Sequence, residues 1–174
     1  MSTTRVLAAV SLVGSIWFSV SAQQPPQREA RCEVSTPNGV VAGSSERQER
    51  SYGNSGLSVF GLWPDGTVIF RPGGAGFVTR DGALGMKFGW TRGVPGKLKV
   101  TGHRLDGLAP PLRFSASDRY RSIGFQPSYL IFPTPGCWEV IAQIDEREDS
   151  SLTFVTKIVK IGEGPAWRLD PPIN

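Results

Sequence analysis

Tryptophan, tyrosine and arginine gather in two short stretches of the chain, and they are its strongest candidates for binding. The stretches are residues 88–93 (Phe-Gly-Trp-Thr-Arg-Gly) and residues 118–121 (Asp-Arg-Tyr-Arg). Side chains of these types dominate the affinity of protein interfaces, and aromatic rings also stack on sugars. The glycines of the first stretch are typical of a loop. We therefore predict a binding surface made of Trp63, Trp90, Arg92, Arg104 and Tyr120.

Trp90 also has a purely structural interpretation. Large aromatic residues often close one end of a hydrophobic core, and residue type favours this role for Trp90 over exposure. The loop setting favours a binding role, because binding residues concentrate on loops. The sequence leaves both interpretations open.

The residues give little support to catalytic chemistry. A nucleophile needs a neighbouring base, most often histidine, and His103 is the only histidine in the chain. Apolar and polar residues alternate over residues 97–103, which predicts that Leu98 and Val100 point inward and His103 outward. The carboxylates that a glycosidase would need are dispersed among turn residues. They are Asp81, Asp106 and Asp118.

Metal and nucleotide sites lack a matching pattern as well. Zinc needs converging histidine and cysteine ligands. The acidic cluster of residues 145–149 lacks the spacing of a calcium loop, so we interpret it as a charged turn that keeps a sheet edge soluble. The glycines of residues 71–77 lack the spacing and the lysine of a phosphate-binding loop. We predict neither a metal nor a cofactor.

The chain has two cysteines, Cys32 and Cys137. They do not form the C-x-x-C motif of redox enzymes, and in an oxidising compartment two cysteines usually pair. A bond between them would close a loop of about 100 residues and stabilise the fold by roughly 4 kcal/mol in the chain-entropy model. We predict a structural disulfide, with two buried thiols as the alternative.

The first residues have the pattern of a secretory signal peptide. Arg5 gives a basic start, residues 6–20 are mainly apolar, and small residues lead up to Ala22 ahead of a proline-bearing stretch. We predict cleavage after Ala22 and export to the periplasm or the medium. The alternative is a membrane anchor, but about 15 apolar residues fall short of the roughly 20 that a spanning helix needs. We expect no membrane span in the mature chain.

The net charge points to no particular partner. The formal charge is +4, and acidic residues interleave with the basic ones. A mild, mixed charge is not the signature of nucleic-acid binding, so we do not predict nucleic acid as a partner. We expect an envelope or extracellular protein, or a glycan.

Short apolar runs between turn residues predict an all-β fold. The chain has 21 glycines and 14 prolines, and such punctuation is typical of a sandwich or a barrel. One hairpin is predicted from residues 57–63 and 67–70, because Pro-Asp-Gly between them favours a turn.

A second hairpin is predicted from residues 129–132 and 137–144, and residues 152–161 should return as a further partner strand. The alternation of this last strand is ambiguous, which indicates a bulge near Phe154 and Val155. Four residues of the preceding strand fall on one face, namely Trp138, Val140, Ala142 and Ile144.

Residues 135–140 (Pro-Gly-Cys-Trp-Glu-Val) resemble the late hairpin of immunoglobulin-like sandwiches. There a glycine precedes an inward aromatic at the turn into the strand, the tyrosine-corner position, and the resemblance assigns this place to Trp138. In that family the second cysteine follows the aromatic by two residues, whereas Cys137 precedes Trp138. Cys137 should therefore face outward and tie the N-terminal strand to the rim of the domain. Residues 61–140 also resemble exported bacterial proteins with no assigned activity.

These observations divide the chain into four parts. They are a signal peptide at residues 1–22, a flexible lead-in at 23–31, a single immunoglobulin-like antiparallel β-sandwich at 32–161 and a proline-rich tail at 162–174. The predicted function is an exported, non-enzymatic binding or structural domain of the cell envelope. Two alternatives stay open, a carbohydrate-binding or adhesion module and an enzyme of an unrecognised type.

Overall fold

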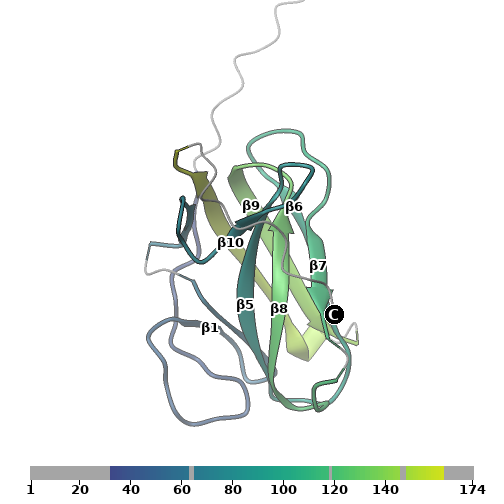
Figure 1. Cartoon of the computed structure of the whole chain (residues 1–174). Coiled ribbons are helices and arrows are strands. Elements are labelled where there is room, and N and C mark those ends of the chain that lie inside the picture. Colours follow the sequence, from purple (N-terminus) through teal and green to yellow (C-terminus); the bar gives the residue numbers. More distant parts are fainter. Residues whose placement is uncertain (1–31, 63–64, 118, 146–147, 163–174) are drawn as a thin grey trace, which may run out of the picture.

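The computed structural model describes residues 32–62, 65–117, 119–145 and 148–162, which fold into strands and connecting turns (Figure 1). The predicted signal peptide, the lead-in and all but the first residue of the tail lie outside these residues. The strands are β1 (Ser51–Gly53), β2 (Leu57–Phe60), β3 (Thr67–Phe70), β4 (Phe77–Val78), β5 (Leu84–Arg92), β6 (Leu98–Arg104), β7 (Arg113–Ala116), β8 (Gly124–Phe132), β9 (Gly136–Ile144) and β10 (Ser151–Lys160). A short 3-10 helix, η1 (Glu148–Ser150), precedes β10.

Two sheets pack face to face and confirm the predicted all-β sandwich. The first sheet has the order β1-β2-β5-β8-β7, with β4 paired to β5, and the second has the order β3-β10-β9-β6. Figure 1 shows β5 and β8 in one layer and β9 and β10 in the other. The strand pairs are antiparallel except β3 and β10, which run parallel. Because side chains alternate along each strand, one face of each sheet is apolar and the two faces form the core.

The order of seven strands matches the order in immunoglobulin-like sandwiches, as the resemblance implies. Its four-strand sheet, A-B-E-D, corresponds to β2-β5-β8-β7, and its C-F-G sheet corresponds to β6-β9-β10. Trp138, at the beginning of β9, is fully buried, and its Nε1–H donates to the Thr134 carbonyl at 3.0 Å. In immunoglobulin-like sandwiches the hydroxyl of a corner tyrosine makes a similar bond to the backbone a few residues upstream.

Both connections that were predicted as hairpins, β2 to β3 and β8 to β9, instead cross between the sheets. β2 pairs with β1 and β5, and β3 pairs with β10. β8 likewise pairs with β5 and β7, and β9 pairs with β6 and β10. Turn residues fix a reversal of the chain. They do not decide whether the next strand pairs with the previous one or joins the facing sheet.

The hairpin from β9 to β10 is confirmed, but the predicted bulge is wrong. The register from Ser151↔Gln143 to Ile158↔Gly136 has no extra residue on either strand. The sequence pattern was ambiguous because Thr156 is a polar residue on the buried face. Its hydroxyl donates to the Gly66 carbonyl at 2.8 Å, which satisfies the buried group.

Residues 88–93, predicted as a glycine-rich loop, mostly belong to β5. The glycines of this strand make room for aromatic rings. A side chain at Gly89 would meet the Phe125 ring 2.6 Å from its Cβ, and one at Gly85 would meet the Phe77 ring at 2.1 Å. Glycine inside a strand often marks such a close approach rather than a loop.

The predicted disulfide between Cys32 and Cys137 is present, with 5.4 Å between the two Cα atoms. Cys137 leaves β9 on the face opposite to Trp138, as expected, but it is only 2% exposed. The N-terminal segment continues beside β10, where Ser35 N–H donates to the Val155 carbonyl at 2.8 Å. The disulfide thus fixes a segment that covers the outer face and the edge of the second sheet. Among the described residues, no helix has the length and apolar character needed to cross a membrane.

Candidate functional site

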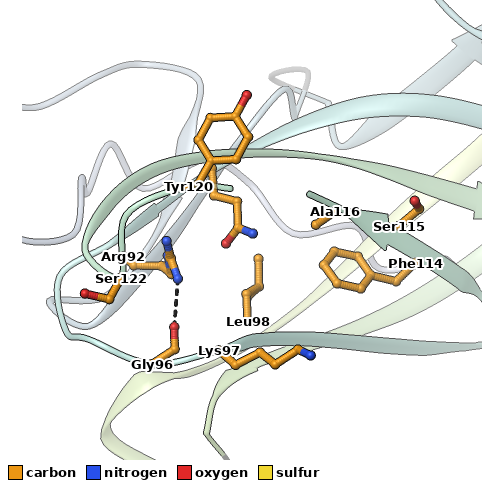
Figure 2. A pocket seen from close by; sticks show the side chains of 10 residues that line it. Arg92, Gly96, Lys97, Leu98, Phe114, Ser115, Ala116, Tyr120 and Ser122 are labelled. Atoms are coloured by element: carbon orange, nitrogen blue, oxygen red, sulfur yellow. Dashed lines mark hydrogen bonds between the residues drawn. The ribbon is translucent and has the colours of Figure 1, made fainter. Parts of the chain in front are cut away.

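A cavity of about 590 Å³ opens between the sheets at one end of the sandwich (Figure 2). It lies where the two edge strands β6 and β7 separate. Near the other end of β6 the strands are still joined, because Leu112 N–H donates to the Gly102 carbonyl at 3.0 Å. The cavity is lined by the end of β5, the beginning of β6, β7, the β7–β8 connection and β8. Small-molecule sites commonly have volumes of about 300–1,000 Å³, so this cavity is large enough for a ligand.

Arg92, the last residue of β5, is a buried cation in the wall of this cavity. It continues the inward-facing apolar row of its strand and is only 4% exposed. Nη1 donates to the Gly96 carbonyl at 2.7 Å and Nη2 donates to the Arg121 carbonyl, but Nε has no hydrogen-bond partner among the described residues. Burial lowers the pKa of the Arg92 guanidinium, yet arginine keeps its charge in proteins.

No carboxylate compensates the charge of Arg92 within the part of the chain that the structure describes. The ion pairs found there join His103 to Glu139, Arg104 to Asp106 and Arg113 to Asp81. A buried charge without an opposite charge carries a large desolvation cost. Two backbone carbonyls offset only part of that cost, because they supply dipoles rather than a negative charge.

Gln126 on β8 has a buried hydrogen-bond acceptor without a donor, whereas Arg92 has a buried donor without an acceptor. The residue is 6% exposed, and its Nε2 donates to the Ser117 carbonyl at 3.1 Å. Its Oε1 atom is buried and accepts no hydrogen bond from any described residue. Gln126 lies directly opposite Trp90 in the register, and Arg92 lies opposite Gly124. Arg92 and Gln126 are therefore diagonal neighbours on the inner face, with about 7–8 Å between their positions on the backbone.

A buried donor and a buried acceptor thus line one cavity, each with an unused hydrogen-bonding atom. Leaving such a group unpaired costs roughly 1–3 kcal/mol. Native proteins bury few such groups, and those that they do bury often have a functional explanation. Both atoms are themselves enclosed by protein, so a molecule in the cavity would contact the remaining parts of these two polar side chains.

The rest of the lining offers apolar and aromatic contacts. In Figure 2, Leu98 lies between Arg92 and Phe114, and Tyr120 and Lys97 lie on opposite sides of it. Leu98 is buried, Phe114 is half-buried, and Tyr120 is 43% exposed. The cavity therefore combines an apolar floor with an accessible aromatic ring at its rim.

The described residues of the predicted binding surface do not lie together in the structure. Arg92 and Tyr120 come together at the cavity. Trp90 is fully buried, with its Nε1–H donating to Ser128 Oγ at 2.8 Å, so it belongs to the core and does not form a surface. Trp63 lies outside the described residues. Arg104 ends β6, roughly 20 Å from Leu98 at a rise of about 3.3 Å per residue.

Arg104 belongs to a separate, satisfied cluster. Its Nε donates to Asp106 Oδ1 at 2.6 Å and its Nη1 lies 3.4 Å from Thr134 Oγ1. Partial burial acts to raise the pKa of Asp106, but hydrogen bonds from Arg104 and from the Cys137 backbone hold that pKa below its usual value.

His103 faces solvent as predicted, with its side chain 59% exposed and Nδ1 3.8 Å from Glu139 Oε1. Leu98 and Val100 point inward on the same strand, also as predicted. No group of three or more histidine, cysteine, aspartate or glutamate side chains converges within the described ranges. Part of the acidic cluster, residues 146 and 147, lies outside those ranges.

Sequence reasoning missed Gln126, Leu98 and Phe114 as cavity residues. A signal for Gln126 was present in the alternation, since it is a large polar residue on the row that continues through Leu130 and Phe132. Arg92 gives the same signal on β5. A polar residue at an inward position contradicts the local pattern, and such contradictions concentrate at functional sites.

Comparison with protein-family models gives no match for this chain, and comparison with curated proteins gives none either.

Proposed function

We propose that the chain is an exported, non-enzymatic domain that binds a component of the cell envelope or the extracellular medium in the cavity between its sheets. The observation that carries the proposal is the placement of two polar side chains, Arg92 and Gln126, at inward positions in the wall of one open cavity. A polar ligand in the cavity would offset part of the cost of burying these two side chains. The proposal therefore explains why polar groups stand where the core pattern calls for apolar ones.

Two further observations support export and a binding role. The disulfide between Cys32 and Cys137 is typical of proteins from oxidising compartments, in agreement with the signal pattern of residues 1–22. The lone histidine, His103, is exposed on the outer face of β6 and does not line the cavity. A general base in that position would have no enclosed substrate to act on.

The test is a binding screen by NMR on the purified, oxidised protein. The probes are neutral sugars, acidic sugars, amino acids and short peptides. At least one class should shift the amide signals of Leu98, Ala116 and Gln126, and the double variant Arg92→Met/Gln126→Leu should lose those shifts. The control Arg71→Met changes an exposed arginine in the turn after β3 and should keep them. Shifts confined to other surfaces, or retained in the double variant, would refute the cavity as the binding site.

A further inference from the structure

The outer face of β8 has an apolar row where a solvent-facing strand normally has polar residues. Phe125, Pro127, Tyr129 and Ile131 alternate with residues that point inward, so they point away from the core. Phe125 is 57% exposed, and Ile123, which directly precedes the strand, is 51% exposed. We call these five residues the β8 stripe. It extends over roughly 27 Å at a rise of about 3.4 Å per residue.

The polarity of β8 is inverted in its first half. Gln126 and Ser128 face the core and are 6% and 3% exposed, whereas the residues beside them on the outer face are apolar. Strands β6 and β9 of the second sheet show the ordinary pattern, with polar and charged residues outside. Their outer residues include Lys99, Thr101, His103, Glu139 and Gln143. An inversion of this kind contradicts the core pattern and is expected where a surface has a function.

The Phe125 ring lies against the neighbouring strand β5. A Cβ atom at Gly89 would lie 2.6 Å from this ring, so the ring occupies the space above the glycine. Phe77 covers Gly85 in the same way and contacts the Tyr129 ring, with 5.5 Å between the ring centroids. The rings thus fill the hollows that the two glycines leave, and the outer face is broad and low. Such a surface suits a flat, extended partner better than a small molecule, which needs a concave site.

The charge of this face is positive. The strands of the first sheet contain no aspartate and no glutamate. Lys87 lies on the outer face of β5 directly opposite Tyr129, is exposed, and forms no ion pair with any described residue. Arg113 on β7 is paired with Asp81 at 3.1 Å. Lys87 is therefore a cation without a counter-charge beside the β8 stripe.

The connection that leads into the stripe adds further positive charge. Arg119 and Arg121 are exposed and lie within four residues of Ile123. Residues 117–123 have two arginines and one aspartate, so their net charge is positive. Exposed apolar residues flanked by lysine and arginine are the combination that binds at the surface of an anionic bilayer.

We propose that the β8 stripe binds an anionic phospholipid surface. Ile123 and Phe125 would enter the boundary between headgroups and acyl chains, and Lys87, Arg119 and Arg121 would contact the phosphates. Tyrosine is enriched at the same depth of a bilayer, which suits the half-buried Tyr129. This surface lies on the outside of the first sheet, so its function does not depend on the cavity between the sheets.

A protein partner fits the stripe less well. Protein interfaces typically carry about one hydrogen bond per 100–200 Å², but the Tyr129 hydroxyl is the only side-chain polar group within the stripe. A second copy of the chain, packed through the same face, would bring the Lys87 side chains and the arginines of both copies together. The boundary of a bilayer needs no directional partners and supplies the opposite charge.

The test is cosedimentation of the purified, oxidised protein with lipid vesicles. The probes are vesicles of phosphatidylcholine alone and of phosphatidylcholine mixed with an equal amount of phosphatidylglycerol. The protein should bind the mixed vesicles at least about tenfold more tightly, and raised salt should weaken that binding. Equal binding to both kinds of vesicle, or to neither, would overturn the inference.

Variants locate the surface, and each has a matched control on the outer face of the second sheet. Phe125→Ser should weaken binding to the mixed vesicles by about tenfold, and Lys87→Gln by about fivefold, the ratio that one basic residue near an anionic surface supplies. The controls Ile69→Ser and Lys157→Gln also change an exposed apolar residue and an exposed cation. They should change binding by less than about twofold. Any contribution from the apolar residues 6–20 is common to all variants. Equal losses in variants and controls would show that the stripe is not the binding surface.

Two measurements separate this surface from the other possible roles. The cavity variant Arg92→Met/Gln126→Leu should keep its vesicle binding, and loss of that binding would assign it to the cavity instead. Sedimentation of the protein without lipid should show a monomer. Self-association that Phe125→Ser abolishes, without binding to vesicles, would identify the stripe as an interface between copies and overturn the lipid assignment.

A measurement on the unaltered chain covers the case in which Phe125→Ser fails to fold. In NMR spectra with mixed bicelles that contain a spin-labelled lipid, the amide signals of residues 123–131 should broaden. Those of residues 99–103, on the opposite face of the sandwich, should stay sharp. Broadening of residues 99–103 alone, or of neither range, would contradict the proposed orientation on the lipid surface.

Discussion

Arg92 and Arg104 lie at opposite ends of the sandwich, and they differ in whether the protein itself satisfies them. Arg104 is held by Asp106 at 2.6 Å, beside Trp138, whose Nε1–H donates to Thr134. Arg92 is more deeply buried, has no carboxylate partner among the described residues and keeps an unpaired Nε. We call the region around Arg104 and Trp138 the closed end and the cavity region the open end.

If the proposed function holds, one residue type serves stability at one end and binding at the other. At the closed end, charge, hydrogen bonds and packing agree, so each group has a partner within the fold. At the open end, polar groups occupy inward positions at a cost to stability. Proteins that retain such a cost commonly do so at functional sites.

The largest expected effect is a difference between the two ends in how much a variant lowers the free energy of unfolding. Trp138→Ala should lower the free energy of unfolding by about 3–5 kcal/mol, because it removes a fully buried ring from the core. Tyr120→Ala at the rim of the cavity should change it by less than about 0.5 kcal/mol. Chemical denaturation of both variants measures the contrast. A loss of similar size in Tyr120→Ala would show that the open end is part of the structural core.

The second comparison exchanges the two arginines for methionine, one at a time. Arg92→Met removes a buried charge that has no carboxylate partner among the described residues, but it also leaves the Gly96 and Arg121 carbonyls without their donor. Because these two effects oppose each other, the free energy of unfolding should stay within about 1 kcal/mol of the wild type. Arg104→Met should lower it by about 1 kcal/mol, since the variant leaves Asp106 without its partner. Thermal and denaturant unfolding without added ligand give both values. A marked loss in Arg92→Met would mean that Arg92 holds the fold together rather than a ligand.

The two ends also differ in how far the sequence predicts them. At the closed end, Trp138 and the disulfide follow from local signals, namely the alternation of β9, the glycine before Trp138 and the two cysteines. The pairing of Arg104 with Asp106 was not predicted, because Arg104 was assigned to a binding surface. The β2–β3 and β8–β9 connections were misread because turn chemistry sets the reversal and long-range packing sets the partner. The open end needed the sheet register, which places Gln126 diagonally from Arg92 although the two are far apart in the chain.

The smallest expected effect is a pH dependence at the closed end. Asp106 has a folded-state pKa below its usual value, so its contribution is present above the unfolded pKa and is lost as pH falls through the folded one. The wild type should therefore exceed Asp106→Asn in stability by roughly 0.5–1 kcal/mol near neutral pH, since the pair is partly exposed. That difference should fade below about pH 4, where carboxylates become protonated. Thermal unfolding of both proteins at pH 7 and pH 3 measures it, and a difference that persists unchanged at pH 3 would show that shape rather than charge is what Asp106 contributes.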